Sequence, residues 1–271
     1  MPSSEPGRSF ALGVVVFSPP NSLWARLAMI ARKGHRIYIY DNSPDDCSTR
    51  GNISWLSGAR YFTAGKNLGL GVALSTICAA AYYDSYDTLL FFDQDTIFDE
   101  RTVDFVGEFC RTALRDYEKS YAAIVFSSDT AGGGTDSGFA ISDVPLAISS
   151  GSLFVLKNLK ALGWHNEHYF VDGVDYELCL RSWRKNLKIA RCRNTPGFDH
   201  VSGQPDRTVK LWGRSIPLRR YATVRILDAF RSYTRLFLSS VSAGQFKFAA
   251  RMVRAGAIYA FGQTMARIMR R

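Results

Sequence analysis

The stretch TLLFFDQDT, residues 88–96, joins a run of strand-forming residues to two carboxylates that stand one residue apart. Its apolar part is continuous rather than alternating, which predicts a strand with both faces buried in a core. Other short runs of strand-forming residues lie at 11–17, 36–40, 60–63, 122–127, 147–156 (interrupted at Ser150-Gly151) and 188–192. Stretches with helical spacing separate most of these runs, and this alternation predicts a parallel α/β sheet.

Helices are expected at about residues 21–33, 72–83, 100–117 and 172–185, and from about residue 216 onward with a break near residues 242–244. Residues 129–143 include three consecutive glycines and are predicted to form a surface loop. In parallel α/β sheets, ligands bind beyond the carboxyl ends of the strands. Asp41, Asp93 and Asp95 all follow predicted strands, so we expect them at one edge of the sheet.

Charge is distributed unevenly along the 271 residues. The chain carries 34 basic and 24 acidic residues, a net charge of +10, and its hydrophobic content of 46% is that of a folded globular protein. From residue 207 onward there are 14 Lys and Arg residues against one acid, Asp228, which leaves 20 basic and 23 acidic residues before it. We therefore predict an α/β body over residues 1–206 and a basic helical extension over residues 207–271.

The extension interleaves arginines with Leu, Phe, Tyr, Ile and Met, which is typical of amphipathic helices lying on an anionic membrane surface. Helices packed on the body, or a contact between copies in a homo-oligomer, are the alternatives. No apolar run approaches the roughly 20 residues of a membrane-spanning helix, and Met1–Pro6 lacks the pattern of a secretion signal. Five scattered cysteines without a Cys-x-x-Cys pair indicate a reducing compartment, so a cytoplasmic location is expected.

Asp93 and Asp95 are the sharpest local signal of chemistry. Two carboxylates one residue apart at a strand end repel each other unless a cation lies between them. Mg²⁺ and Mn²⁺ prefer such oxygen ligands, together with substrate phosphates. A solvated turn that caps the next helix is the structural alternative. The pair is also similar to the phosphatase signature of the haloacid dehalogenase superfamily, but it departs from that signature at Ile97 and lies a third of the way along the chain.

Asp41-Asn42-Ser43 ends the second predicted strand. An acid at this position can accept hydrogen bonds from a ribose or a base, whereas an Asx turn is the structural alternative. The glycines of residues 65–71 lack the GxGxxG spacing, so a dinucleotide fingerprint is excluded. The stretch remains a glycine-rich entry to a helix, suited either to close approach of a diphosphate-linked ligand or to tight helix–sheet packing.

Residues 169–177, YFVDGVDYE, place three acids near the start of a helix. An aspartate there is often only a cap, and Glu177 can pair with Arg181 one turn later. A carboxylate beside aromatic residues is also how a general base is built, because apolar surroundings raise its pKa. His200, taken alone, is more typical of an ordinary loop histidine than of a ligand.

Taken in order, these elements resemble the inverting family-2 glycosyltransferases, and among them the bacterial rhamnosyltransferases. The resemblance covers residues 14–203 and rests on an ordered set of motifs: DNS at 41–43, NLGLGVA at 67–73, DQDT at 93–96, SG at 150–151, FVDGVDYE at 170–177 with Arg181, and HVSG at 200–203. Each motif is weak by itself, but the ordered set is specific. Residues 221–225 resemble a further Tyr…Arg-Asn signature, although Ile226 replaces its asparagine, as Ser75 does in the first helix motif.

The resemblance implies a GT-A-like, Rossmann-related mixed sheet flanked by helices. It implies that Asp175 is the catalytic base and that Asp95, with His200, binds Mg²⁺ or Mn²⁺. The donor-binding residues that it implies are Asp41, Asn67, Gly69, Asp93 and Gln94. The acceptor-binding residues that it implies are Ser150, Gly151, Asp172 and Glu177.

The implied reaction is a single displacement that moves a sugar from a nucleoside-diphosphate donor to a hydroxyl of a bacterial surface glycan, such as O-antigen, or of its lipid-linked precursor. The sugar is expected to be L-rhamnose from a dTDP-rhamnose-like donor. The enzyme would act as a peripheral protein at the cytoplasmic face of the inner membrane. Competing classes are a metal-dependent phosphohydrolase using Asp93 and Asp95, a silent sensor of sugar nucleotides, and a nucleic-acid-binding protein. A nucleic-acid partner is not expected, because it leaves the motifs of the acidic body unexplained.

Overall fold

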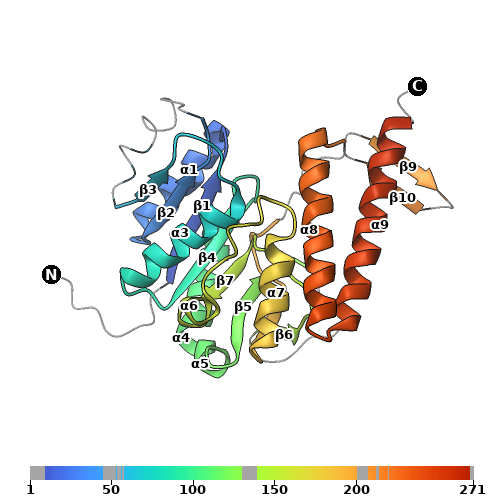
Figure 1. Ribbon diagram of the computed structural model, residues 1–271. Helices are drawn as coiled ribbons and strands as arrows, with labels where there is room; N and C mark the ends of the chain where they lie inside the picture. The colour runs from blue at the N-terminus through green and yellow to red at the C-terminus, as the bar shows by residue number, and fades with distance from the viewer. Residues whose placement is uncertain are drawn as a thin grey trace.

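The computed structural model describes residues 10–44, 53, 56, 58–129, 139–199, 207–211, 214–218 and 220–268. Its centre is an eight-stranded sheet in the order β3-β2-β1-β4-β7-β5-β8-β6 (Figure 1). The strands are β1 (Phe10–Val16), β2 (Ile37–Asp41), β3 (Arg60–Thr63), β4 (Thr88–Asp93), β5 (Tyr121–Phe126), β6 (Ala140–Asp143), β7 (Ser152–Val155) and β8 (Lys188–Arg193). β6 and β7 run antiparallel to their neighbours, and the remaining pairs are parallel.

Helices cover both faces of this sheet. One face carries α3 (Leu70–Tyr83), α6 (Leu156–Leu162) and α7 (Val174–Arg184), and the other carries α1 (Asn21–Arg32), α4 (Glu100–Thr112) and α5 (Leu114–Tyr117). The burial of both faces of β1 explains why its sequence is apolar throughout. Leu12 and Val14 pack on the α1 and α4 side, whereas Ala11 packs on the α3 side. Continuous apolar runs are expected where both faces of a strand are buried.

The predicted strands at 11–17, 36–40, 60–63, 88–92, 122–127 and 188–192 are all present, with boundaries within one residue of those expected. The sheet is mixed, as the family resemblance implied, and not wholly parallel as the alternation alone predicted. The reason is β7, which lies between β4 and β5 and runs against both. The interruption predicted at Ser150-Gly151 is present as a turn over residues 149–151, and of the stretch 147–156 only Ser152–Val155 forms a strand.

Two elements of the body were not predicted. β6 lies within residues 129–143, which were expected to be a loop, and pairs with β8 at the edge of the sheet. Its four residues are half-buried or exposed, and their sequence, AISD, contains no long apolar run that would predict a strand. α6 follows β7 without an intervening turn and has no side-chain cap, so the sequence lacks the usual start signal for a helix.

The C-terminal part begins with a hairpin of β9 (Arg207–Leu211) and β10 (Arg214–Leu218). Helix was predicted from about residue 216 onward, but residues 214–218 pair with β9 instead, so the helical region begins only at Thr223. Two long helices follow, α8 (Thr223–Ser242) and α9 (Phe246–Ile268), with the break where it was expected. They stand side by side at one end of the sheet, with α8 next to α7 (Figure 1). No helix among the described residues combines the length and the apolar character that crossing a membrane requires.

Both C-terminal helices are attached to the body through buried side chains. Leu236 of α8 and Phe248 and Met252 of α9 belong to the same core cluster as α3, α6 and α7. Arg184 of α7 donates a hydrogen bond to the backbone carbonyl of Ser239 in α8. The helices therefore pack on the body, which was one of the alternatives for the basic extension.

Candidate active site

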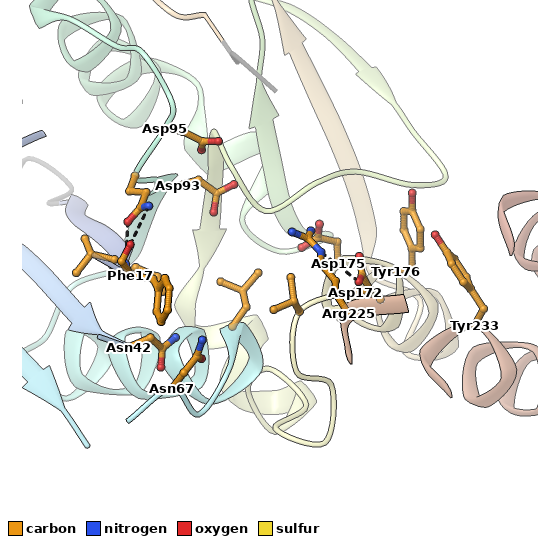
Figure 2. Close-up of a pocket in the computed structure, with 16 residues that line it drawn as sticks. Phe17, Asn42, Asn67, Asp93, Asp95, Asp172, Asp175, Tyr176, Arg225 and Tyr233 are labelled. Carbon is orange, nitrogen blue, oxygen red and sulfur yellow. Dashed lines mark hydrogen bonds and ion pairs between the residues drawn. The ribbon is translucent and has the colours of Figure 1, made fainter. Parts of the chain in front are cut away.

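A cavity of about 440 Å³ opens beyond the carboxyl ends of β1 and β4, and the starts of α7 and α8 form its far wall (Figure 2). Its walls come from segments that are far apart in the sequence. Asp93, Asp95 and Asp175 all line it. The structure therefore brings together three of the four carboxylates that the sequence predicted to share a site, and Asp41 is the exception.

The turn over residues 93–95 is held by side chains from two other segments. Arg26 of α1 donates to the carbonyls of Gln94 at 3.0 Å and of Thr96 at 2.8 Å. The Gln94 amide accepts from the N–H of Phe17 at 2.8 Å and donates to its carbonyl at 3.1 Å. These bonds tie the turn to the middle of α1 and to the residue after β1, so both aspartates are presented to the cavity on a fixed backbone.

Ser150 supports the same turn from behind. Its hydroxyl accepts from the N–H of Asp93 at 3.2 Å and lies 2.6 Å from the hydroxyl of Thr96. Gly151 is required for packing, because its φ is +79° and a Cβ there would lie 2.7 Å from the carbonyl oxygen of Phe126. Neither residue lines the cavity. Ser150 and Gly151, two of the four predicted acceptor-binding residues, therefore lie behind the wall of the cavity.

The other two predicted acceptor-binding residues differ in position. Glu177 pairs with Arg181, which donates to its two carboxylate oxygens at 3.0 and 2.8 Å, and this pair braces α7 away from the cavity. Asp172 lines the cavity. Its backbone N–H donates to Asp228 of α8 at 3.2 Å, as does that of Val171 at 3.3 Å. The single acid of the basic extension thus fixes the loop that carries Asp172.

Asp175 lies in the first turn of α7 and faces the same cavity as Asp93. Burial raises the pKa of Asp175 to about 6, and the hydrogen bond from the Ser149 hydroxyl opposes this shift while the charge of Asp172 adds to it. Burial also raises the pKa of Asp93 to about 7, assisted by the charges of Asp175 and Asp95. These carboxyls therefore titrate near neutral pH, where a carboxylate is a more effective proton acceptor.

Asp41 is buried and its carboxylate is occupied by the protein itself. Its two oxygens accept from the N–H of Ser43 and from the hydroxyl of Tyr61, both at 2.8 Å. The neighbouring Asn42 lines the cavity instead, and its amide bonds the backbone of Leu68 at 3.1 Å and of Gly69 at 3.2 Å. Asp41 therefore shapes the turn, as in the Asx alternative, and Asn42 is the polar group that the turn presents.

The glycines of the 65–71 stretch serve packing. Gly69 has φ +90°, and a Cβ there would lie 2.5 Å from the carbonyl oxygen of Phe170. A Cβ on Gly71 would lie 2.6 Å from the carbonyl oxygens of Asn166 and Tyr169. The glycine-rich stretch therefore packs tightly, as the packing alternative predicted, but it packs against the loop before α7 and not against the sheet. Asn67, which also precedes α3, does line the cavity.

The residues present fit a divalent cation in part. Asp95 is an exposed carboxylate at the rim of the cavity and accepts no hydrogen bond from any described residue. Among the described residues no three His, Cys, Asp or Glu side chains gather into a metal site, and His200, the other predicted ligand, lies outside them. Mg²⁺ is commonly held by one or two carboxylates plus substrate phosphates. Asp95 suits that mode of binding, and a cation beside it would also relieve the repulsion between Asp93 and its neighbouring carboxylates.

Several residues of the site were not predicted. Arg225 and Tyr233 line the cavity from α8, and Tyr176 lines it from α7. The Tyr…Arg signature near residue 221 was a signal for Arg225, whereas nothing local marks Tyr233. Ser149, which positions Asp175, precedes the predicted Ser150-Gly151 motif by one residue. α8, the first helix of the basic extension, therefore forms part of the cavity wall.

Comparisons with known proteins identify the fold. No family model and no curated protein matches the chain. Among solved structures, S. aureus TarS is similar with a TM-score of 0.52 and 14% sequence identity, over 70% of this chain and 36% of TarS. Its fragment 1–349 in complex with UDP-GlcNAc has a TM-score of 0.57 at 11% identity, over 90% of this chain and 71% of the fragment.

GalNAc-T7 with UDP, GalNAc and Mn²⁺ has a TM-score of 0.50 at 11% identity, over 73% of this chain and 46% of that one. For the two TarS structures without a ligand, this chain spans 36% and 59% of their length. At such low identities the likeness establishes the fold, which is the GT-A glycosyltransferase fold that the sequence motifs implied.

Proposed function

We propose that the protein is an inverting glycosyltransferase that moves a sugar from a nucleoside diphosphate to a hydroxyl acceptor. The observation that carries this proposal is that Asp93, Asp95 and Asp175 line one cavity at the carboxyl edge of a GT-A sheet. The motif order along the sequence and the fold support the same activity. The phosphohydrolase alternative needs a lysine beside the aspartates, and no lysine lines the described part of the cavity.

The donor is expected to lie across the ends of β1, β2 and β4. Asn42 and Asn67 line the cavity where the nucleoside would lie, and Gln94 fixes the backbone of Phe17 in the cavity wall through two hydrogen bonds. Asp93 and Asp95 lie where the diphosphate would follow. A divalent cation held by Asp95 would supply positive charge that stabilises the departing diphosphate.

Asp175 is proposed as the general base. Its carboxylate accepts the proton of an acceptor hydroxyl while that oxygen forms a bond to the anomeric carbon. The bond from the anomeric carbon to the diphosphate oxygen breaks at the same time, and the nucleoside diphosphate leaves with the electron pair. Attack from the side opposite to the leaving group inverts the anomeric carbon. Ser149 donates to one oxygen of Asp175 and so orients the other toward the cavity.

The resemblance to rhamnosyltransferases favours dTDP-L-rhamnose as the donor. A panel of UDP, GDP and dTDP sugars, each tested with Mn²⁺ and with Mg²⁺, identifies the donor by thermal shift and by release of nucleoside diphosphate on addition of glycan acceptors. We expect one nucleotide class to raise the melting temperature by several degrees, because only the folded state binds it. A protein that no nucleoside diphosphate stabilises would contradict the proposal.

We further propose that α8 and α9 dock on an anionic membrane that carries a lipid-linked acceptor. Phe246, Val253, Phe261 and Ile268 are all exposed and lie along one side of α9 at helical spacing. α8 carries a comparable exposed set, which includes Val224, Leu227 and Leu238. Arginines accompany both sets, and a polybasic surface gains about 1 kcal/mol per charge near anionic lipid. Positive charge beside apolar side chains favours a lipid surface over a second copy of the chain.

Replacing Val253 and Phe261 together with serine should abolish binding to vesicles that contain phosphatidylglycerol, measured by co-sedimentation. The fold should be retained, because the two side chains are 56% and 50% exposed. Tyr83→Ser is the matched control, since Tyr83 is 70% exposed but lies on α3. Equal pelleting of all three proteins, or a dimer in light scattering that only the double variant disrupts, would refute the membrane docking.

A further inference from the structure

One end of the cavity is not used by the proposed donor. It lies where α7 meets α8, and Asp172, Tyr176, Arg225 and Tyr233 line it (Figure 2). In Figure 2 this group stands across the cavity from Asn42 and Asn67, with Asp172 and Arg225 drawn close to Asp175 and the two tyrosines beyond them. The two aromatic rings come from neighbouring helices, so this end is built jointly by the body and the basic extension.

Two polar atoms, one lining this end and one behind it beside Tyr233, are buried without a hydrogen-bond partner among the described residues. They are Oδ2 of Asp172 and the hydroxyl of Tyr259 in α9. Arg225 Nε lies 3.6 Å from that Asp172 oxygen, beyond hydrogen-bond distance, and its guanidinium is held 4.3 Å from the ring centre of Tyr221. Buried polar groups are almost always paired in native proteins. The Asp172 oxygen is ion-paired with Arg225 but accepts no hydrogen bond from a described residue, so it is suited to a ligand with adjacent hydroxyl groups, which can both donate and accept.

The charge of the cavity selects against an anionic ligand here. At this end the carboxylates of Asp172 and Asp175 stand against one cationic side chain, Arg225, which is the one cation among the described residues that line the cavity. The charge of Arg225 is already offset by Asp172. A phosphate or uronate at this end would meet like charges, which electrostatic complementarity disfavours. A neutral ligand would not.

We propose that this end is the acceptor subsite and that it takes a neutral pyranose with vicinal hydroxyl groups. Asp172 and Arg225 bond the hydroxyls, and Tyr176 and Tyr233 offer ring faces and edges to the apolar side of the sugar. The proposal rests on the glycosyltransferase function argued above. It assigns acceptor specificity to α8, a helix of the basic extension, so the extension is part of the binding machinery as well as a docking element.

Arg225→Gln and Tyr233→Ala test this proposal, with Arg231→Gln on the exposed side of α8 as the matched control. The probes are methyl glycosides of neutral hexoses and 6-deoxyhexoses, with a methyl uronide and a hexose 6-phosphate for comparison. Binding is measured by saturation-transfer NMR with UDP or dTDP present. We expect neutral glycosides to bind the parent protein and the control. We also expect each cavity variant to weaken that binding at least about tenfold, the discrimination lost when buried polar partners are left unpaired.

Affinity for the nucleoside diphosphate, measured separately by calorimetry, should change less than about twofold in both variants, because the nucleotide lies at the other end of the cavity. This separates the subsite from the function, since failure of the function appears as no nucleotide binding by the parent protein. Three results would overturn the subsite: no neutral glycoside binds the parent, the uronide or phosphate binds more tightly than the neutral sugar, or the variants weaken nucleotide and glycoside equally.

Discussion

Asp175→Asn should lower the turnover number by about 10² to 10⁴-fold, the range that a general base contributes. Asparagine can still accept the hydrogen bond from Ser149, so the geometry of the first turn of α7 is kept, but it cannot take a proton. Affinity for the nucleoside diphosphate should be retained. In the parent protein, kcat/KM should rise as the pH passes through about 6, because Asp175 becomes ionised there and can then accept a proton.

The same substitution should stabilise the fold at neutral pH. Burial raises the pKa of Asp175 above the ordinary aspartate value of 3.8, so ionisation of this carboxyl disfavours the folded state. Below about pH 4 the carboxyl is protonated in the folded and the unfolded state, so it does not change the free energy of unfolding. As the pH rises the carboxyl ionises more readily in the unfolded state, and the resulting loss of stability is complete above about pH 6. Because the residue is partly exposed, the gain is of the order of 1 to 2 kcal/mol. Melting temperatures of parent and variant should therefore diverge above pH 6 and converge near pH 4.

Asp116→Asn, at an exposed acid in α5, is the control for both measurements and should match the parent in turnover and in melting temperature. Two outcomes would remove Asp175 from the role of base. One is an active Asp175→Asn variant, and the other is a loss of turnover that follows a loss of nucleotide affinity.

Asp95→Asn should reduce turnover at least about 100-fold and remove its dependence on Mn²⁺ or Mg²⁺. Its carboxylate lies exposed at the rim of the cavity without a hydrogen bond from a described residue, so the melting temperature should stay within a degree or two of the parent. Metal titration of nucleotide binding, followed by calorimetry, is the measurement. For the parent protein, EDTA should abolish turnover and added Mn²⁺ should restore it.

Asp93→Asn provides the comparison for Asp95→Asn. Burial and two neighbouring carboxylates raise the pKa of Asp93, so its substitution should relieve repulsion and stabilise the fold. Loss of turnover with higher stability at position 93, and loss of metal dependence with unchanged stability at position 95, would separate the two roles. An Asp95→Asn variant whose turnover is still inhibited by EDTA would place the cation elsewhere.

The strands and most helices of the body were predictable because each has a strong local signal. β1 and β4 are apolar without interruption, and both lie in the middle of the sheet. The position of Asp93 and Asp95 at the sheet edge was predictable as well, since both follow a central strand and ligands bind beyond the carboxyl ends of such strands. That Asp175, in the first turn of α7, would join them was implied only by the family motifs. Asp95 and Asp172 line the cavity as the motifs implied.

Other parts of the site depend on tertiary contacts that no local pattern records. Asp41 and Ser150 stand in the predicted motifs, yet their side chains are used to fix turns, and their neighbours Asn42 and Ser149 are the groups that line the cavity or hold Asp175. Tyr233 is one aromatic residue among many in α8. Only the packing of α8 on α7, fixed by Asp228 and Leu236, turns its ring toward the cavity.

The central claim is that a sugar moves in one displacement, with Asp175 taking the acceptor proton. The most direct measurement is the anomeric configuration of the product, read from the ¹H and ¹³C coupling constants of the new glycosidic linkage. Single displacement predicts the configuration opposite to that of the sugar in the donor. A product that retains the donor's configuration would contradict the account, because retention requires either two displacements or attack from the side of the leaving group.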